Sequence, residues 1–265
     1  MQCDEIKTVL EHIPTGGKFL YSALNRFSPA DVMELFEHLG VPLKVERGNR
    51  VFPVSDQAGD VAGALIRNME RSGVHVFQAS AQALCVENGA VTGVETTKGR
   101  IDCRNAVICT GGLSYPATGS TGDGHRLAAL VGHTVVPCRP SLVPLESSDE
   151  YCAEMQGFSL KNVTLTAFED DKRIYRDLGE MMFTHFGVTG PLVLSASAHM
   201  RDMEGRRYRL EIDLKPGLDE EKLDARILRD FEAQKNKEFK NSLGGLAGRM
   251  MIPVLVRLSG IDPET

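Results

Sequence analysis

The sequence predicts an α/β protein that continues into a small, mainly β region and ends in a helical region. Helical and strand-like patterns alternate in the first half of the chain. Within that half, the apolar run at residues 106–109 does not alternate with polar residues, which is typical of a strand buried on both faces of a parallel sheet. Short β-like stretches follow a proline-rich crossover at residues 137–144. We therefore expect three parts, at residues 1–140, 141–215 and 216–265.

Length and composition describe an ordinary globular protein and exclude several classes. The chain has 265 residues, is 42% hydrophobic and 25% charged, and has a formal net charge of -6. This acidity argues against sequence-independent nucleic-acid binding, which needs clustered basic residues. The sequence contains neither an apolar run of the roughly 20 residues that a membrane helix needs nor the pattern of a signal peptide at its start. We therefore expect a cytoplasmic protein without membrane contact.

The six cysteines are scattered and form no C-x-x-C pair. In a chain of this length without a secretion signal, we expect them to be reduced thiols. Histidine and cysteine also lack the spacing of metal ligands, so no metal site is expected.

The first helix that the sequence defines clearly begins after Ser28. Ser28 can cap the free amides, Pro29 suits the first helical position, and Asp31 favours the positive end of the helix dipole. Gly40 ends the helix. The next expected elements are a hairpin with strands at 42–45 and 51–54, a helix over 56–72, and strands at 74–77, 83–86, 91–95, 101–103 and 106–109.

The second half of the chain is predicted to be β-rich and then helical. The expected elements are β stretches at 160–168, 173–175, 181–184 and 208–214, a helix from Pro191 to about residue 200, a charged helix that begins at Asp219, and a helical region at 243–258.

A glycine-rich loop at residues 110–124 follows the apolar run at 106–109 and precedes an apolar helix. Open α/β sheets bind ligands where a parallel strand ends, and amides at the start of a helix suit an anion. A long structural turn with capping residues is the alternative. The length and the position of the loop favour a ligand.

Four motifs occur in the same order as in a known family. They are G-K-F-L-Y-S-A-L-N-R-F at 17–27, R-G-N-R-V-F-P-V-S-D at 47–56, T-G-G-L-S-Y-P-A-T-G-S-T-G-D-G at 110–124, and F-T-H-F-G-V-T-G-P at 183–191. Together they resemble the aminoacetone-oxidase-like family of FAD-dependent oxidoreductases, which includes a bile-acid-pathway reductase and belongs to the glutathione-reductase/fumarate-reductase superfamily. The resemblance implies a FAD-binding domain interrupted by a small β-barrel-like domain that carries a helical insert.

Members of that family begin with a strand, a G-x-G-x-x-G-type loop and a helix that hold the ADP half of FAD. No such element precedes the first motif here. The resemblance therefore leads us to expect an internal fragment, a partial FAD/NAD(P)-binding domain without its N-terminal ADP-binding βαβ unit. Alone, this fragment is expected to bind little FAD and to be inactive.

The resemblance also implies roles for individual residues. Thr110, Gly111 and Gly112 would pack against FAD near its diphosphate or ribityl portion, and Ala81 would hold adenine through its backbone. The residues that would line the flavin-proximal pocket are Ser114, Tyr115, Gly119, Ser120, Thr121, Gly122, Asp123 and Gly124. Asp123 has the alternative of simply capping the helix that it precedes.

Several polar residues carry both a functional and a structural interpretation. Arg47, Asn49 and Arg50 contact the flavin or an anionic substrate, or else they form a polar hairpin tip. Tyr115 orients substrate or anchors the loop before Pro116. His185 acts as an acid or base, or is structural.

The implied function is hydride transfer between FAD and either a small-molecule substrate or NAD(P)H. Two alternatives stay open: a different α/β nucleotide-binding protein that uses the glycine-rich loop for phosphate, and a non-catalytic binding module without flavin. The identity of the substrate, the choice between oxygen and NAD(P) as electron partner, and the oligomeric state are left open by the sequence.

Overall fold

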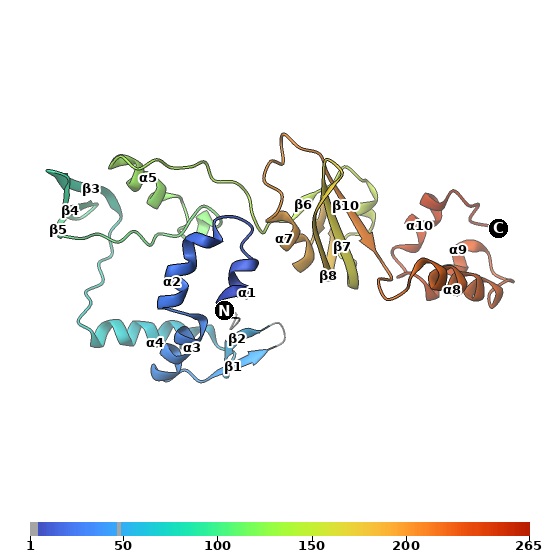
Figure 1. Ribbon diagram of the computed structural model, residues 1–265, viewed down its shortest axis with the longest axis horizontal. Helices are drawn as coiled ribbons and strands as arrows, with labels where there is room; N and C mark the ends of the chain where they lie inside the picture. The colour runs from blue at the N-terminus through green and yellow to red at the C-terminus, as the bar shows by residue number, and fades with distance from the viewer. Residues whose placement is uncertain (1–4, 47–48) are drawn as a thin grey trace. The chain divides into compact units, whose positions relative to one another are not determined.

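A computed structural model describes residues 5–46 and 49–265. The chain forms two compact units (Figure 1), an N-terminal unit, Met1–Pro137, and a C-terminal unit, Cys138–Thr265. None of the described helices combines the length and apolar character that crossing a bilayer requires.

The N-terminal unit contains helices and two small antiparallel sheets. Its helices are α1 (Ile6–Glu11), α2 (Tyr21–Arg26), α3 (Pro29–His38), α4 (Ala58–Arg71) and α5 (Asp123–Leu130), with short 3₁₀ turns η1 (Gly17–Leu20) and η2 (Pro116–Thr118). Strands β1 (Leu43–Glu46) and β2 (Arg50–Pro53) form a hairpin, and β3 (Ala81–Glu87), β4 (Ala90–Thr96) and β5 (Gly99–Asp102) form a three-stranded sheet in that order.

The predicted start of α3 is confirmed in atomic detail. The Ser28 Oγ atom accepts a hydrogen bond from the Asp31 amide at 3.2 Å, and the Ser28 amide donates to the Asp31 carboxylate at 2.7 Å. This reciprocal capping box satisfies two backbone donors that the helix itself leaves free. The predicted hairpin, the helix now seen as α4, and the strands now seen as β3, β4 and β5 are also confirmed.

The strands predicted at residues 74–77 and 106–109 are wrong for the described chain. Both segments are irregular, and the Val107 side chain is 86% exposed instead of buried. A strand exists only where a neighbour completes its hydrogen bonds, and β3, β4 and β5 pair antiparallel among themselves. Among the described residues, no segment pairs with either apolar run, so the expected parallel sheet is not formed there.

The C-terminal unit is built on one antiparallel sheet with helices. Its strands are β6 (Leu145–Glu146), β7 (Ser159–Glu169), β8 (Lys172–Thr184), β9 (Gly187–Thr189) and β10 (Tyr208–Asp213), in the spatial order β10-β7-β8-β9-β6. Its helices are α6 (Tyr151–Glu154), α7 (Pro191–Ser197), α8 (Glu220–Glu232), α9 (Phe239–Ser242) and α10 (Ile252–Ser259), with a 3₁₀ turn η3 (Leu243–Gly245). The helices and β stretches predicted for this half are confirmed, except that the two stretches predicted at 173–175 and 181–184 are parts of one strand, β8.

One hydrophobic core holds the C-terminal unit together. Leu165 of β7 and Val193 of α7 are fully buried in it. Met251 and Val254, at the start of α10, belong to the same cluster. The helical region at the end of the chain is therefore packed into the core of the sheet, where each fully buried aliphatic side chain contributes about 1.5–3 kcal/mol.

Candidate functional site

The glycine-rich loop (residues 110–124) runs into the start of α5 in the N-terminal unit (Figure 1). Gly122 precedes the helix with a φ of 85°, and a Cβ there would lie 2.6 Å from Leu113 Cδ2. The Gly122 amide donates to the carbonyl of Gly112 at 3.2 Å and closes the loop on itself. The positive φ favours glycine at this position. A larger residue would also displace the exposed Leu113 side chain.

The amides of residues 111–114 belong to a longer segment, residues 104–115, whose amides donate no hydrogen bond within the described residues. A Cβ added at Gly112 would meet nothing within 4 Å. Consecutive free amides beside open space suit the anionic or polar part of a ligand. The loop therefore fits the diphosphate or ribityl portion of FAD that the resemblance assigns to it.

A hydrogen-bonded network joins the start of α5 to the start of β3. Thr121 Oγ1 donates to one Asp123 carboxylate oxygen at 2.9 Å, and Arg126 Nη2 lies 3.2 Å from the other. The Thr121 hydroxyl and then Arg126 lower the pKa of Asp123. Arg126 also donates to the carbonyls of Gln82 at 2.7 Å and Ala81 at 3.2 Å.

The structure thus brings together three residues that the sequence analysis predicted for the site, Ala81, Thr121 and Asp123. Arg126, which the sequence analysis did not predict, connects them. The Asp123 side chain bonds Thr121 and Arg126 and makes no capping bond to the helix. The signal for Arg126 in the sequence was its position three residues after Asp123, a spacing at which side chains on a helix meet.

Tyr115 presents its backbone to the loop and its ring to solvent. Its carbonyl accepts hydrogen bonds from the Thr118 amide, the Thr118 hydroxyl and the Ser120 amide at 3.0, 3.0 and 3.2 Å. The side chain is 70% exposed. The backbone of Tyr115 therefore anchors the loop, while the ring stays available for a ligand.

The remaining predicted residues of the loop are placed as follows. Gly111 and Gly119 have φ values of 73° and 98°. A Cβ at Gly124 would lie 2.6 Å from Thr110 Oγ1, so the helix start packs directly on the beginning of the loop. Ser114 is exposed. A Cβ at Gly111 would lie 3.1 Å from Ser120 Oγ, which places these two residues side by side.

Of the three predicted residues at the hairpin tip, Arg47 lies outside the described residues. Asn49 adopts a left-handed backbone with a φ of 55°, as a tight hairpin tip requires. The Arg50 guanidinium lies 5.8 Å from the centroid of the Phe52 ring, at the distance of a cation–π contact.

His185 lies in the C-terminal unit, in the turn between β8 and β9, whereas the glycine-rich loop belongs to the N-terminal unit. The imidazole is exposed and packs edge-on against Phe186, with ring centroids 5.0 Å apart. The preceding residue, Thr184, has a buried hydroxyl with no partner among the described residues.

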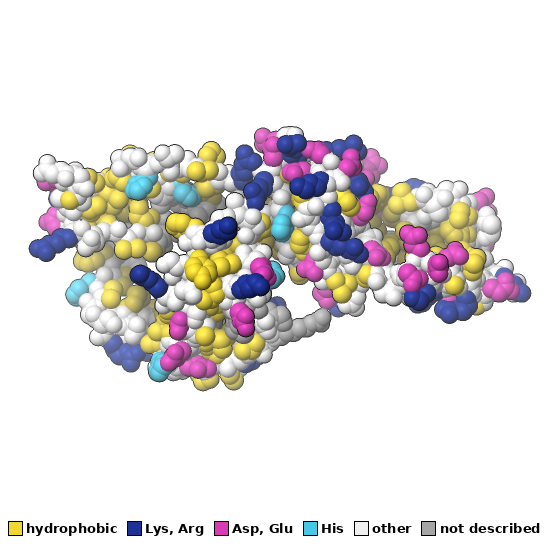
Figure 2. Space-filling view, in the orientation of Figure 1, with side chains coloured by type: hydrophobic (Ala, Val, Ile, Leu, Met, Phe, Trp, Pro, Cys, Tyr) yellow, Lys and Arg dark blue, Asp and Glu magenta, His cyan; other side chains and the backbone are white. Residues whose placement is uncertain are grey.

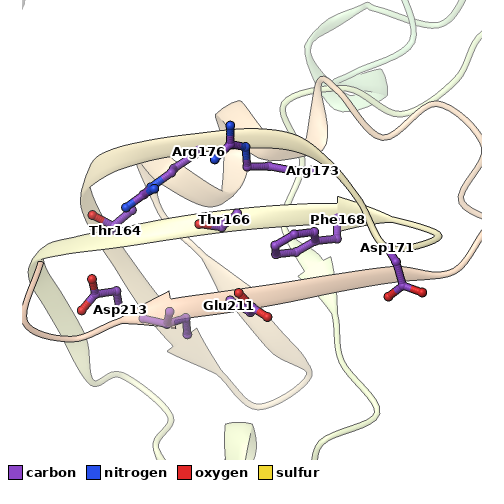
Figure 3. Close-up of a pocket in the computed structure, with 9 residues that line it drawn as sticks. Thr164, Thr166, Phe168, Asp171, Arg173, Arg176, Glu211 and Asp213 are labelled. Atoms are coloured by element: carbon purple, nitrogen blue, oxygen red, sulfur yellow. The ribbon is translucent and has the colours of Figure 1, made fainter. Parts of the chain in front are cut away.

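A groove of about 620 Å³ lies on the open face of β7, β8 and β10 in the C-terminal unit. Figure 3 shows Arg173 and Arg176 on β8 facing Glu211 and Asp213 on β10 across a floor of β7 residues. On the face of the molecule seen in Figure 2, basic and acidic side chains are likewise interspersed over this unit. None of the residues predicted for the site lines the groove, and its opposite charges are typical of a solvated sheet face.

Among the described residues, no group of three or more His, Cys, Asp or Glu side chains could hold a metal ion. The glycine-rich loop with the Arg126 network is the candidate site, because it combines unpaired backbone amides with an ion pair and hydroxyl groups.

Comparison with known proteins identifies the class to which this fold and loop belong. The family described as "HI0933-like protein Rossmann domain" matches residues 1–254. The chain therefore belongs to the HI0933-like family. This confirms the resemblance to the family of FAD-dependent oxidoreductases that the motifs indicated.

Three curated relatives are similar over most of the chain. The 3-dehydro-bile acid delta(4,6)-reductase of Clostridium scindens is 26% identical over 247 residues, which cover 92% of this chain and 60% of the relative. The ribosomal RNA dihydrouridine synthase of Haemophilus influenzae is 30% identical over 217 residues, covering 79% and 51%. That of Escherichia coli is 27% identical over 244 residues, covering 92% and 58%. The chain thus spans 51% to 60% of the length of these relatives.

Proposed function

We propose that this chain is part of a FAD-dependent oxidoreductase and that the glycine-rich loop holds the cofactor. The observation that carries the proposal is the position of the unpaired amides of residues 111–114, within the glycine-rich loop and beside the open space at Gly112. Family membership supports flavin as the group that this loop receives. The proposal concerns the intact gene product, in a polypeptide of the relatives' length.

The residues of this chain would bind and orient the cofactor, which itself supplies hydride transfer when bound. The amides of residues 111–114 would donate to its diphosphate or ribityl oxygens. Ala81 would face adenine through its amide and through the carbonyl lone pair that Arg126 leaves free. Tyr115 would orient substrate, and His185 would hold or deliver a proton. Arg47, Asn49 and Arg50 would contact the flavin or an anionic part of the substrate.

We propose an architecture to match. Residues 1–140 would form part of the FAD domain, 141–215 a barrel-like β domain, and 216–265 a helical insert. The enzyme would act in the cytoplasm and use NAD(P)H as a candidate electron donor.

The names of the relatives support a substrate class. One is named for reduction at delta(4,6) positions and two for making dihydrouridine, which is uridine with its C5=C6 bond saturated. We therefore propose that the substrate has a C=C bond conjugated to a carbonyl group. A hydride would reach one carbon of the bond, and a proton would reach its neighbour from a side chain or from water.

A small-molecule substrate is the first candidate, because the net charge of -6 disfavours contact with phosphate backbones. A uridine in RNA is the second, favoured by the two dihydrouridine synthases. To distinguish the two candidates, the purified protein is reduced anaerobically with NADH or NADPH. A steroid enone or a uridine oligonucleotide is then added, and the substrate is the acceptor that reoxidises the flavin.

The cofactor assignment is tested by the flavin absorbance of the purified intact protein. We expect Gly111→Val and Gly122→Val to lose most of the bound FAD, because both positions have positive φ and close neighbours. Gly59→Val is the matched control, since Gly59 lies in α4 of the same unit with nothing within 4 Å of an added Cβ. A colourless wild-type protein, or equal flavin in all four proteins, would contradict the proposal.

A further inference from the structure

Arg126 occupies an unusual position between two segments that are far apart in the sequence. Its guanidinium reaches from the first turns of α5 to the carbonyls of Gln82 and Ala81, 44 and 45 residues earlier, at 2.7 and 3.2 Å. The same group bonds the Asp123 carboxylate, at 3.3 Å through Nε and 3.2 Å through Nη2. One side chain therefore holds the end of the glycine-rich loop and the start of β3 at a set distance.

The segment that Arg126 holds is a weak point of the sheet. Ala81 pairs with Thr96 and Ala83 with Glu95, so the register shifts between Ala81 and Ala83 and Gln82 is left out of the ladder. Such a bulge removes regular hydrogen bonds at the position where it occurs. The Gln82 carbonyl is the atom to which Arg126 donates at 2.7 Å. Arg126 thus replaces an interaction that β4 does not supply.

Asp123 keeps the guanidinium in place from the opposite side. Its second oxygen accepts a hydrogen bond from Thr121 Oγ1 at 2.9 Å, which fixes the carboxylate to the loop. Arginine presents its donors in a planar, rigid fork, so it can bond a carboxylate and two carbonyls in one orientation. Lysine has no such fork and can satisfy only part of this arrangement.

We infer that Arg126 is a positioning residue that sets the affinity for the adenine half of the cofactor by holding the Ala81–Gln82 backbone against the loop. This inference rests on the proposed function, in which Ala81 faces adenine and residues 111–114 face the diphosphate or ribityl portion. Without Arg126 the Ala81–Gln82 backbone would not be held in place before the cofactor binds. The entropy cost of ordering it would then reduce the binding free energy. The bonds to the Ala81 and Gln82 carbonyls lie on the adenine side of the proposed site, so their loss should affect adenosine binding more than flavin binding.

The test compares Arg126→Met and Arg126→Lys with the wild-type intact protein. In Arg126→Met the dissociation constants of FAD and ADP should rise about tenfold, the loss expected for charge-assisted hydrogen bonds. The dissociation constant of FMN, which lacks adenosine, should change less than about twofold. Arg126→Lys should be intermediate. Arg104→Met, at an exposed position of the same unit without an ion pair in the described chain, should match wild type.

A second readout needs no ligand. Amide hydrogen exchange at residues 81–84 of the cofactor-free protein should be faster in Arg126→Met than in Arg104→Met, while exchange in α3 stays unchanged. A wild-type protein that binds none of the three ligands would overturn the proposed function. Unchanged FAD and ADP binding in Arg126→Met, equal losses of FAD and FMN, or unchanged exchange at 81–84 would overturn this inference alone.

Discussion

Arg257 of α10 and Glu154 of α6 form a bidentate ion pair although 103 residues separate them. Nη2 donates to Oε1 at 2.7 Å and Nη1 donates to Oε2 at 3.0 Å. Arg257 lowers the pKa of the Glu154 carboxyl, chiefly through these hydrogen bonds. The pair fixes the end of α10, whose start is buried in the core through Met251 and Val254.

Glu154→Gln should destabilise the protein slightly at neutral pH, by no more than a few degrees in melting temperature, because the pair is exposed and screened by water. A depressed carboxyl pKa contributes stability above the unfolded value near ~4.3, and that stability is lost as pH falls through the folded value. Thermal unfolding should therefore separate variant and wild type at neutral pH and not in strong acid. Glu180→Gln, an exposed glutamate without an ion pair among described residues, is the control. A difference that persists in acid would contradict this account.

Ser197→Ala should cost about 1–3 kcal/mol of unfolding free energy, because it leaves a partly buried amide without an acceptor. Ser197 is 1% exposed, accepts from the Val143 amide at 2.9 Å and donates to the Leu194 carbonyl at 2.8 Å. Chemical denaturation measures the change. Ser148→Ala, at an exposed position of the same unit, should be nearly neutral. Equal effects of the two substitutions would show that the bond to Val143 contributes nothing.

Stability should fall in mild acid because of His199. Burial, and then the charge of Arg201, lower the pKa of this imidazole, which packs 5.3 Å from the Tyr175 ring. The unfolded chain then binds a proton that the folded chain resists, so stability falls as pH drops below the ordinary histidine value near ~6.5 and levels off below the folded value. His199→Gln should flatten the pH dependence of unfolding in that window. An unaltered slope in His199→Gln would refute the assignment.

Gly112→Ala separates a structural glycine from a functional one. Its φ is not positive, and a Cβ there meets nothing within 4 Å, so the cofactor-free protein should keep its melting temperature. If FAD lies against this backbone, the added methyl group should weaken FAD binding about tenfold or more through lost contacts. Fluorescence titration with FAD measures the effect, with Gly59→Ala as control. Unchanged FAD affinity in Gly112→Ala would place the cofactor elsewhere.

The sequence predicted those structural elements that are determined by residues close together in the chain. The start of α3 was predictable because Ser28 and Asp31 cap it within one turn. The strands at 74–77 and 106–109 were predicted wrongly. An apolar run indicates that a segment favours burial, but it does not indicate whether a neighbouring strand is present to pair with it. The packing of Met251 against the sheet was not predictable, since the residues it meets lie far away in the sequence.

The same limit applies to the candidate site. The glycine-rich loop was predictable from its composition. The structure additionally shows that the amides of residues 111–114 are unpaired within the described chain. Arg126 was not predicted because two of its partners are backbone carbonyl groups. Every residue has such a group, so the residue types at 81 and 82 do not indicate these hydrogen bonds. Bridges of this kind, from a side chain to a distant backbone, are visible only once the chain is folded.

The exposed runs at 74–77 and 106–109 also determine how this polypeptide behaves in solution. Val76, Phe77 and Val107 are 73%, 69% and 86% exposed, and within the described chain residues 75–79 and 106–109 donate no backbone hydrogen bonds. Exposed apolar segments with unpaired backbone amides tend to form hydrogen bonds and apolar contacts with the same segments of other molecules. A purified preparation of this chain would therefore aggregate increasingly as its concentration is raised.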